Sequence, residues 1–342
     1  MPTRRIHIQE MKETLTLIVP LLDRHELTDR SLKWLEQQEC ECKVILADGS
    51  KVPFSGSYKS LDIQYFYNGF DENIARYMNK MHRATQMVET PSCMIFDNDD
   101  VINLSGILNG AYFLSENDDY STYQNDVRPL EIYPEISVKD SLYTGKSIEQ
   151  ELPEDRLLNV ISNFNSFNYA VFRTSIMKCF FEIMDALKND DFQLFQKSWA
   201  YTSAILGKCK RLQDQSYYYF IPGNSILQTG GKVHKFSNWV STQYWNESCP
   251  KMVSIISCLY RGDIREIFLR AFLDEICKKN NIEPASEEYI DGVIKASHDY
   301  DDTVRKVVDK YCKLFTFESW RFNAQEYYPV GHATFVEDII DG

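Results

Sequence analysis

The feature of this sequence that most restricts its fold is an alternation of short apolar runs and amphipathic helical patterns in the first third of the chain. Runs with the length and composition of buried strands occupy residues 15–20, 43–47, 63–67 and 93–96. Helical patterns at about 28–38 and 71–90 separate the first run from the second and the third from the fourth. Strands that alternate with helices through short loops are typical of a parallel sheet with helices on its faces, so we predict an α/β fold.

The rest of the chain predicts more helix than strand. Helical patterns cover 106–114, 157–164, 176–187 and 192–206, and strand-like runs cover 168–173, 209–212 and 217–222. Residues 115–153 are polar, rich in Tyr and interrupted by Pro, which predicts hairpins and loops. The later patterns, at 252–279, 287–298 and 302–315, are all helical. We therefore predict a sheet-containing domain at 1–248 and a helical C-terminal subdomain at 249–342.

Charge and cysteine usage exclude some classes of protein. A formal net charge of −13 and a pI near 5.0 argue against nucleic acid as a partner, because binding to phosphates needs clustered Lys and Arg. Nine cysteines occur without a zinc-type C-x-x-C pair, so we expect reduced thiols. The early apolar run 15–22 is interrupted by Pro20 and is too short to span a bilayer. We expect a cytoplasmic protein without a transmembrane segment, and leave open a peripheral association with the inner face of the membrane.

The most informative polar stretch is Asp97-Asn98-Asp99-Asp100, which directly follows the apolar run 93–96. A strand would carry these side chains to the edge of a sheet, where open α/β sheets bind their ligands. Crowded carboxylates repel one another unless a cation lies among them, and Mg²⁺ usually takes one or two carboxylates plus substrate phosphates. The alternative is a solvated acidic turn. A dinucleotide or P-loop site is not supported, because the chain has neither G-x-G-x-x-G after its first strand nor G-x-x-x-x-G-K-[ST].

Other segments carry further candidate side chains. Asp48-Gly49-Ser50 follows the second predicted strand, where Asp48 either binds a ligand or forms a turn. Asp190-Asp191 precedes the helical pattern 192–206, where Asp190 is well suited as the helix N-cap. His234 follows Gly230-Gly231 and is either a third ligand to a metal or phosphate or a structural or exposed histidine.

Four of these pieces, taken in order, resemble the nucleotide-sugar glycosyltransferases of the GT-A fold, and the family 2 group in particular. They are Leu17-Ile18-Val19-Pro20 with Arg24, the run from Val44 to Ser50 with Asp48, Asp97-Asn98-Asp99, and Asp190-Asp191. The resemblance covers roughly the first two-thirds of the chain. It implies a Rossmann-like, mostly parallel sheet flanked by helices, with residues 1–248 as the catalytic domain.

The resemblance also implies roles for individual residues at the sheet edge. Asp99 would bind Mn²⁺ or Mg²⁺ directly, and Asp97 would hold a ribose hydroxyl or a metal-bound water. Pro20 and Arg24 would belong to the nucleotide-binding loop, and Asp48 would accept hydrogen bonds from the nucleobase or ribose.

The acidic pair would supply the general base. Asp191 would take the proton of the acceptor hydroxyl during a direct displacement that inverts the anomeric carbon. The usual Glu-Asp pair is Asp-Asp here, so Asp190 remains an alternative base. The start of the helix at Asp191-Phe192-Gln193-Leu194 and the Gly207-Lys208 turn also resemble a bacterial subgroup of these enzymes. The Q/R-x-x-R-W element of processive synthases is absent.

The function implied by the resemblance is transfer of a sugar from a nucleotide-sugar donor to a hydroxyl of a glycan or lipid-linked glycan acceptor. The expected setting is the synthesis of a bacterial surface polysaccharide, such as capsule or O-antigen. Two alternatives remain open, a sugar nucleotidyltransferase and a non-catalytic module that binds nucleotide sugars. The first would need a Gly-rich basic loop where this chain has Leu21-Leu22-Asp23-Arg24. Tyr217-Tyr218-Tyr219 would either stack on a sugar or pack in the core.

Overall fold

A computed structural model describes residues 13–131, 137–138, 140, 145–164, 166–220, 239, 244–260, 262–281 and 283–315. Its strands are β1 (Leu15–Leu21), β2 (Lys43–Asp48), β3 (Asp62–Tyr67), β4 (Ser92–Ile95), β5 (Val101–Ile102), β6 (Tyr120–Glu131), β7 (Ser137–Val138), β8 (Val171–Arg173) and β9 (Lys208–Phe220). Its helices are α2 (His25–Gln37), α3 (Ile74–Gln86), α4 (Leu104–Glu116), α5 (Pro153–Ser162), α6 (Thr174–Ala186), α7 (Phe192–Leu206), α9 (Trp245–Tyr260), α10 (Arg265–Asn280), α11 (Glu287–Ser297) and α12 (Asp301–Tyr311), with 3-10 turns at His298–Tyr300 and Cys312–Leu314. The predicted α/β class is confirmed.

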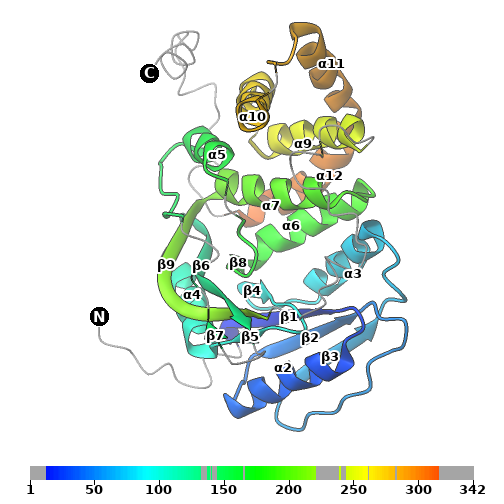
Figure 1. Ribbon diagram of the computed structural model, residues 1–342, viewed down its shortest axis with the longest axis vertical. Coiled ribbons are helices and arrows are strands. Elements are labelled where there is room, and N and C mark those ends of the chain that lie inside the picture. Colours follow the sequence, from blue (N-terminus) through cyan, green and yellow to red (C-terminus); the bar gives the residue numbers. More distant parts are fainter. Residues whose placement is uncertain are drawn as a thin grey trace.

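The strands form one mixed sheet in which β1 occupies a central place (Figure 1). Its order is β3-β2-β1-β4-β8-β6-β9-β5, with β7 paired to β6. Strands β3, β2, β1 and β4 are parallel, β8 runs antiparallel to both β4 and β6, and β9 is parallel to β6. After β1 the chain proceeds to β2 on one side, and β4 later adds on the other side. This makes the gap between β1 and β4 a topological switch point, the place where open α/β sheets bind ligands.

The central strands are apolar on both faces because each face is covered by helices. Alternate residues of β1 contribute to two hydrophobic clusters, with Leu17 and Val19 in one and Ile18 in the other. The first cluster includes buried side chains of α2 and α4, and the second includes those of α3, α6 and α7. This period of two explains the uninterrupted apolar runs seen in the sequence.

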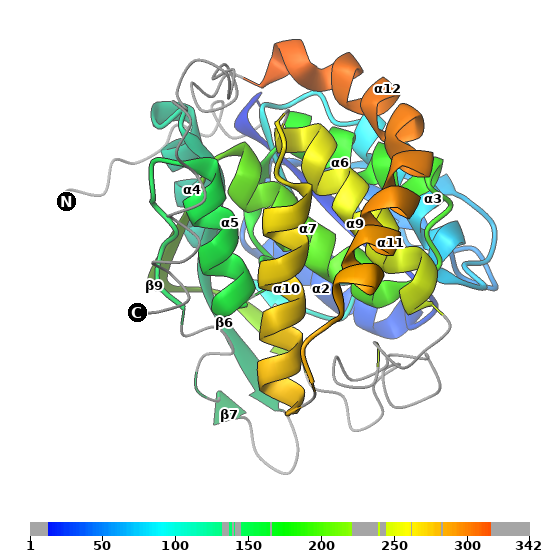
Figure 2. The ribbon, with the colours of Figure 1, turned by 90° about the horizontal axis from the view of Figure 1, so that it is seen from above.

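The C-terminal helices continue the second cluster rather than forming a core of their own. Side chains of α9, α10, α11 and α12 belong to the same cluster as those of α6 and α7. Figure 2 shows α9 and α10 lying over α7, with α12 at the margin near α6 and α3. The predicted boundary between residues 248 and 249 falls inside α9, whose buried side chains include Ser248 and Met252.

Several local expectations are corrected. Pro20 does not end β1, which continues to Leu21; the register of β4 with β1 stops at Ile18, so no β4 partner is lost at the proline. The helix predicted at about 28–38 begins three residues earlier, at His25, so Thr28 lies inside α2 rather than capping it. The helix predicted at 71–90 is shorter, because α3 begins at Ile74 with Asn73, not Asp71, as its N-cap.

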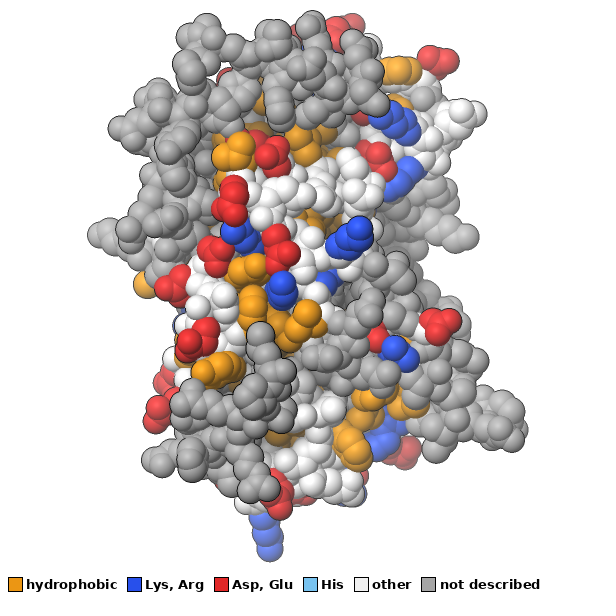
Figure 3. Space-filling model, turned by 90° about the vertical axis from the view of Figure 1, so that its left-hand side faces the viewer, with side chains coloured by type: hydrophobic (Ala, Val, Ile, Leu, Met, Phe, Trp, Pro, Cys, Tyr) orange, Lys and Arg blue, Asp and Glu red, His pale blue; other side chains and the backbone are white. Residues whose placement is uncertain are grey.

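The larger difference is β6, because its residues were expected to form hairpins and loops rather than one long strand of the main sheet. It is a twelve-residue strand that pairs with β8 and β9. Figure 3, which looks at the molecule from the β9 side of Figure 1, shows acidic and basic side chains interspersed among scattered hydrophobic ones on the described part of this face. Within the described residues, no helix has the length and apolar character needed to cross a membrane.

Candidate functional site

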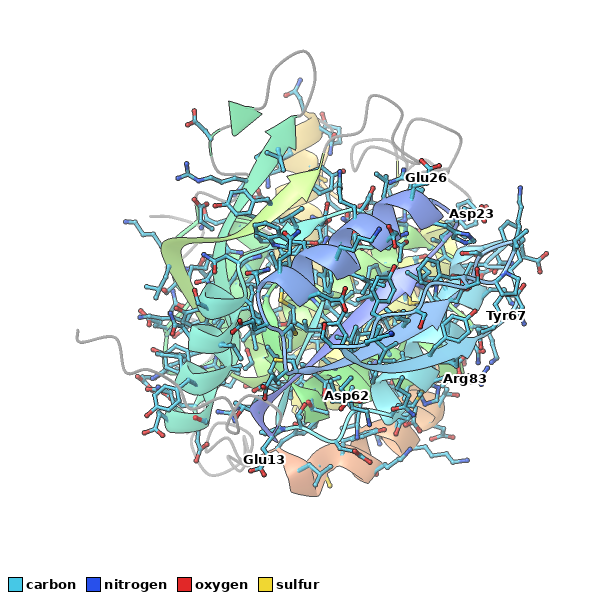
Figure 4. All side chains as sticks on the ribbon, turned by 90° about the horizontal axis from the view of Figure 1, so that it is seen from below. Glu13, Asp23, Glu26, Asp62, Tyr67 and Arg83 are labelled. Atoms are coloured by element: carbon cyan, nitrogen blue, oxygen red, sulfur yellow. The ribbon has the colours of Figure 1, made fainter. Side chains whose placement is uncertain are left out.

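The candidate site lies at the edge of the sheet where the parallel strands end. Loops following β1, β2, β3 and β4 meet there, as the parallel registers require. Figure 4 shows Asp23, Glu26 and Tyr67 near this edge, and Glu13 and Asp62 toward the opposite ends of β1 and β3. The sequence-predicted residues Arg24, Asp48, Asp97 and Asp99 all belong to these loops or strand ends.

Two tyrosines, Tyr169 and Tyr217, hydrogen-bond to the loop after β4. The sequence did not identify either of them as a partner of this loop. The Tyr169 hydroxyl donates to Asp97 Oδ2 at 3.1 Å, and the Tyr217 hydroxyl donates to Asp100 Oδ2. The two rings stack with centroids 4.2 Å apart. Asp100 is fully buried and does not cap α4, whose N-cap is Asn103. Tyr217, expected to stack on a sugar or pack in the core, is buried beneath this loop.

Asp99 is surrounded by basic side chains from the β1–α2 segment. Arg24 Nη1 donates to the Asp99 carboxylate, and Arg30 Nη2 donates to the Asp99 backbone carbonyl. Nearby, Asn98 Nδ2 donates to the Asp23 carbonyl at 3.1 Å and to Thr28 Oγ1 at 2.8 Å. The loop after β4 is therefore fixed against the loop after β1, across the switch point.

The electrostatics of this edge favour a cation. Burial, reinforced by the neighbouring charge of Asp99, raises the pKa of Asp97 to about 6, although Tyr169, Arg24 and Lys80 lower it. Burial is the larger cause of this shift, and the charge of Asp99 adds to it. A cation bound beside Asp97 would stabilise its ionised form.

Asp48 is occupied by its own loop. Its Oδ1 accepts from Ser50 N at 2.8 Å, and its Oδ2 accepts from Phe54 N at 2.7 Å and from the Tyr65 hydroxyl at 2.8 Å. Although burial opposes ionisation, these hydrogen bonds keep the pKa of Asp48 below its usual value. The carboxylate thus holds the β2–β3 loop, which agrees with the predicted role of Asp48 as a turn former. The predicted contact of Asp48 with a nucleotide stays a prediction. Pro20 is buried within β1 opposite Ala47.

A buried ion pair, which sequence reasoning missed, lies under the same edge. Lys80 of α3 is fully buried, pairs with Asp71 and donates to the Leu21 carbonyl at 3.0 Å. Burial lowers the pKa of Lys80 and raises that of Asp71. A β-carbon at Gly49 would lie 2.1 Å from Asp71 Oδ2, so the glycine is needed where these loops touch. The only sequence signal was a lysine at a helix position surrounded by apolar neighbours.

The acidic pair lies at the same edge, on the face covered by α3 and α6. Chain direction places it there: β8 runs antiparallel to β4, and α6 then returns the chain to the end where α3 begins. Asp190 Oδ1 accepts from the amides of Ile74 and Ala75, at the start of α3. Tyr77, whose hydroxyl pKa is raised by burial and by the charge of Asp97, packs edge-on against α7 through Phe195. Tyr77 therefore connects α3 to the first turn of α7.

The structure makes Asp191, not Asp190, the N-cap of α7. Asp191 Oδ1 accepts from Gln193 N at 2.8 Å, and Oδ2 accepts from Trp239 Nε1 at 2.7 Å and from Ser248 Oγ. Asp191 is buried and Asp190 is exposed. A carboxylate offers about four lone-pair positions, so three hydrogen bonds leave roughly one on Asp191 for another proton.

The residues present fit a divalent ion that is shared with a substrate. The described residues contain no group of three or more His, Cys, Asp or Glu side chains able to hold a metal ion by themselves. Asp97 and Asp99 are hard oxygen ligands, and an arginine guanidinium already lies on Asp99 as a cation. Mg²⁺ is commonly bound through one or two carboxylates plus substrate phosphates, which matches such a set. His234, the predicted third ligand, lies outside the described residues.

No protein-family model matches the chain, and no curated protein sequence matches it. Solved structures do match. The S. aureus TarS 1–349 structure superposes with a TM-score of 0.52, at 15% identity, covering 88% of this chain and 91% of that chain. Its complex with UDP-GlcNAc gives a TM-score of 0.51 at 16% identity, covering 88% and 92%. A longer TarS structure gives a TM-score of 0.51 at 17% identity, covering 87% of this chain and 55% of that chain.

At these identities the likeness establishes the fold. TarS is a GT-A-type glycosyltransferase, and the expected mostly parallel sheet with flanking helices and C-terminal helices is confirmed. The likeness does not support the bacterial subgroup suggested by the Asp191–Leu194 and Gly207–Lys208 segments. The chain therefore has a glycosyltransferase fold of the GT-A type.

Proposed function

We propose that this protein is a metal-dependent, inverting glycosyltransferase that uses a nucleotide sugar, with a uridine diphosphate sugar as the first candidate. The observation that carries the proposal is the meeting of Asp97, Asp99 and Arg24 at the switch point of a GT-A sheet. The complex of TarS with UDP-GlcNAc supports the choice of nucleotide sugar. The proposed acceptor is a hydroxyl of a glycan or of a lipid-linked glycan, and the proposed setting is the synthesis of a bacterial surface polysaccharide.

Different residues of this chain would have different roles in glycosyl transfer. Asp99, with Asp97 beside it, would hold a Mn²⁺ or Mg²⁺ ion, which when bound neutralises charge on the departing diphosphate. Tyr169 and Tyr217 orient the loop that carries both carboxylates. Asp97 is half-buried, and the lower dielectric around its carboxylate would strengthen its interaction with a cation.

The general base comes from the acidic pair at the same edge. We place it at Asp191, because three hydrogen bonds fix the direction of its carboxylate and about one lone-pair position is left to accept the acceptor proton. Asp190, which is exposed and lies at the start of α3, is the alternative.

The experiment compares the full chain with an Asp99→Ala variant in an assay for release of UDP from UDP-sugars, with and without Mn²⁺. We expect turnover by the wild-type protein that depends on the ion, and a loss of about a hundredfold or more in the variant. The matched control is Asp62→Ala, an exposed aspartate at the other end of β3, which should behave as wild type.

The same assay separates the alternatives. Turnover that is unchanged by Asp99→Ala and needs no divalent ion would refute the metal-dependent proposal. Release of pyrophosphate from a nucleoside triphosphate and a sugar phosphate would favour a nucleotidyltransferase. A shift in melting temperature with nucleotide sugar and Mn²⁺, but no turnover, would favour a binding module.

A further inference from the structure

The carboxylate proposed to bind metal already has a cation of this chain on it. Arg24 Nη1 donates to Asp99 Oδ2, and the two side chains are only 19% and 10% exposed. Arg24 contacts Oδ2, and a divalent ion on either oxygen of the same carboxylate would lie close to the guanidinium and be repelled by it. The guanidinium and a divalent ion therefore compete for Asp99.

We propose that Arg24 is a built-in counterion that holds Asp99 while the site is empty and must leave it before a divalent ion binds. The ion then binds poorly to the free protein and well when a diphosphate arrives to receive the displaced guanidinium. This inference rests on the proposed function for the identity of the ligand and adds an order to its binding.

The position of Arg24 is imposed by the loop after β1. Asp23 and Arg24 are consecutive non-glycine residues in the left-handed region, with φ of 55° and 57°. This conformation is uncommon and persists only where the surroundings enforce it. The Asp23 amide donates to Ser50 Oγ at 2.8 Å, and the Asp23 carbonyl accepts from Asn98 at 3.1 Å. The ends of β2 and β4 thus fix the backbone that aims the guanidinium.

Displacement of Arg24 would leave the metal-binding loop in place. Arg30 donates to the backbone carbonyl of Asp99, and Ser31 Oγ donates to the backbone carbonyl of Asp100 at 2.6 Å. These main-chain contacts from α2 do not involve the Asp99 carboxylate. Within the part of the chain that the structure describes, the ion pair on the Asp99 carboxylate is the one with Arg24, so the exchange needs a rotation of that side chain rather than a rearrangement of the loop.

The displaced guanidinium has a second use at the same edge. A planar guanidinium matches the spacing of two phosphate oxygens, and Arg24 starts from the loop next to the one that carries Asp97 and Asp99. The same positive charge would neutralise Asp99 in the empty site and the diphosphate in the loaded site. Removing Arg24 should therefore strengthen the binding of the ion alone and weaken the binding of the nucleotide in the presence of the ion.

The test is a Mn²⁺ titration of the full chain without nucleotide, followed by electron paramagnetic resonance of the free ion. We expect Arg24→Ala to bind Mn²⁺ roughly tenfold to a hundredfold more tightly than the wild-type protein, the equivalent of one hydrogen bond between charged groups. In a second titration with UDP at saturating Mn²⁺, the same variant should bind UDP more weakly. Arg24→Lys keeps the charge without the planar fork, so its affinities for Mn²⁺ and for UDP should lie between those of the wild-type protein and those of Arg24→Ala.

The control is Arg270→Ala, which removes an arginine paired with Glu266 and Glu287 on α10 and α11 and should leave Mn²⁺ binding unchanged. Adding Asp99→Ala to Arg24→Ala should abolish the gain. The counterion role is overturned if Arg24→Ala, folded by circular dichroism, binds Mn²⁺ no more tightly than wild type. Tighter binding in a protein that transfers no sugar would support the counterion and refute only the proposed function.

Discussion

Among single residues, the two neighbouring carboxylates before α7 have different surroundings. Asp191 is buried and receives hydrogen bonds from Gln193 N, Trp239 Nε1 and Ser248 Oγ, whereas Asp190 is exposed and receives backbone amides from the start of α3. The sequence could show that both positions precede a helix. It could not show which carboxylate turns inward, because Trp239 and Ser248 lie 48 and 57 residues beyond Asp191 in the chain.

Asparagine substitutions separate the two positions. Asp191→Asn keeps an N-cap acceptor but brings an amide donor toward Trp239 Nε1, so we expect the free energy of unfolding to fall by about 1–3 kcal/mol. Asp190→Asn keeps its backbone partners and should change stability by less than about 0.5 kcal/mol. Urea unfolding measures both.

The turnover of the same two variants identifies the base. If Asp191 is the base, Asp191→Asn lowers kcat by about 10²–10⁴-fold with little change in KM for the nucleotide sugar. Asp190→Asn should then retain most of the activity. The reverse ranking of kcat would assign the base to Asp190.

Lys80 is a second residue whose surroundings make a sharp prediction. Lys80→Met leaves Asp71 buried without its partner, and we expect a loss of about 3–5 kcal/mol in the free energy of unfolding. A double variant with Asp71→Leu should recover part of that loss, because no charge remains buried. An additive effect of the two changes in urea unfolding would mean that the two side chains do not act as a pair.

Among elements, the strands with apolar runs were predictable and β6 was not. The runs that became β1, β2 and β4 are largely buried, and the run that became β3 is an edge strand rich in aromatic residues, so composition alone marks them. β6 buries polar side chains instead. Gln124 donates to the Asn168 carbonyl at 2.7 Å, and Asn125 donates to the Gly106 carbonyl at 2.8 Å. Such a strand depends on partners distant in sequence, and no local pattern reveals it.

The junction of α12 with α3 and α6 makes a prediction about pH. Lys310 and the Tyr311 hydroxyl each donate to Glu182 Oε2 at 2.6 Å, and His82 lies between Glu182 and Asp185. Burial alone would raise the pKa of Glu182, but the hydrogen bonds from Lys310 and Tyr311 outweigh it and hold the pKa below 4.5. A depressed pKa means that the folded state favours the ionised form. The stability from this contact is therefore present above pH 4.5 and is lost as the pH falls through the folded pKa.

Glu182→Gln tests this junction. We expect the variant to unfold about 1–2 kcal/mol more easily than wild type at pH 7, and the difference to narrow as the pH is lowered below about 4.5. Glu89→Gln is the matched control, since the Glu89 side chain is 84% exposed in its pair with Lys43. A difference between Glu182→Gln and wild type that stayed constant from neutral to acid pH would contradict the assignment.

For the whole molecule, the sequence predicted that the candidate residues meet at one edge of the sheet, but not which side chains hold that edge together. Parallel strands bring their carboxyl ends to one edge, so the placement of Asp48 and Asp97 followed from the strand pattern. Tyr169, Tyr217 and Lys80, which hold that edge together, approach it from segments whose positions depend on the completed sheet. The C-terminal helices were predicted as helices, but sequence patterns do not show which surface they cover.

The shared core predicts how the chain responds to truncation. Every residue of α7 from Leu194 to Leu206 except Gln196 is buried, α9 packs on α7, and Phe268 and Phe272 of α10 pack edge-on against Tyr201 of α7. A fragment of residues 1–248 would expose this apolar surface and cut α9 after its first turn. We expect the fragment to aggregate or to lack a cooperative urea transition, while the full chain unfolds in one transition. A monomeric 1–248 fragment with its own sharp transition, or two separate transitions in the full chain, would show that the sheet domain is stable without its C-terminal helices.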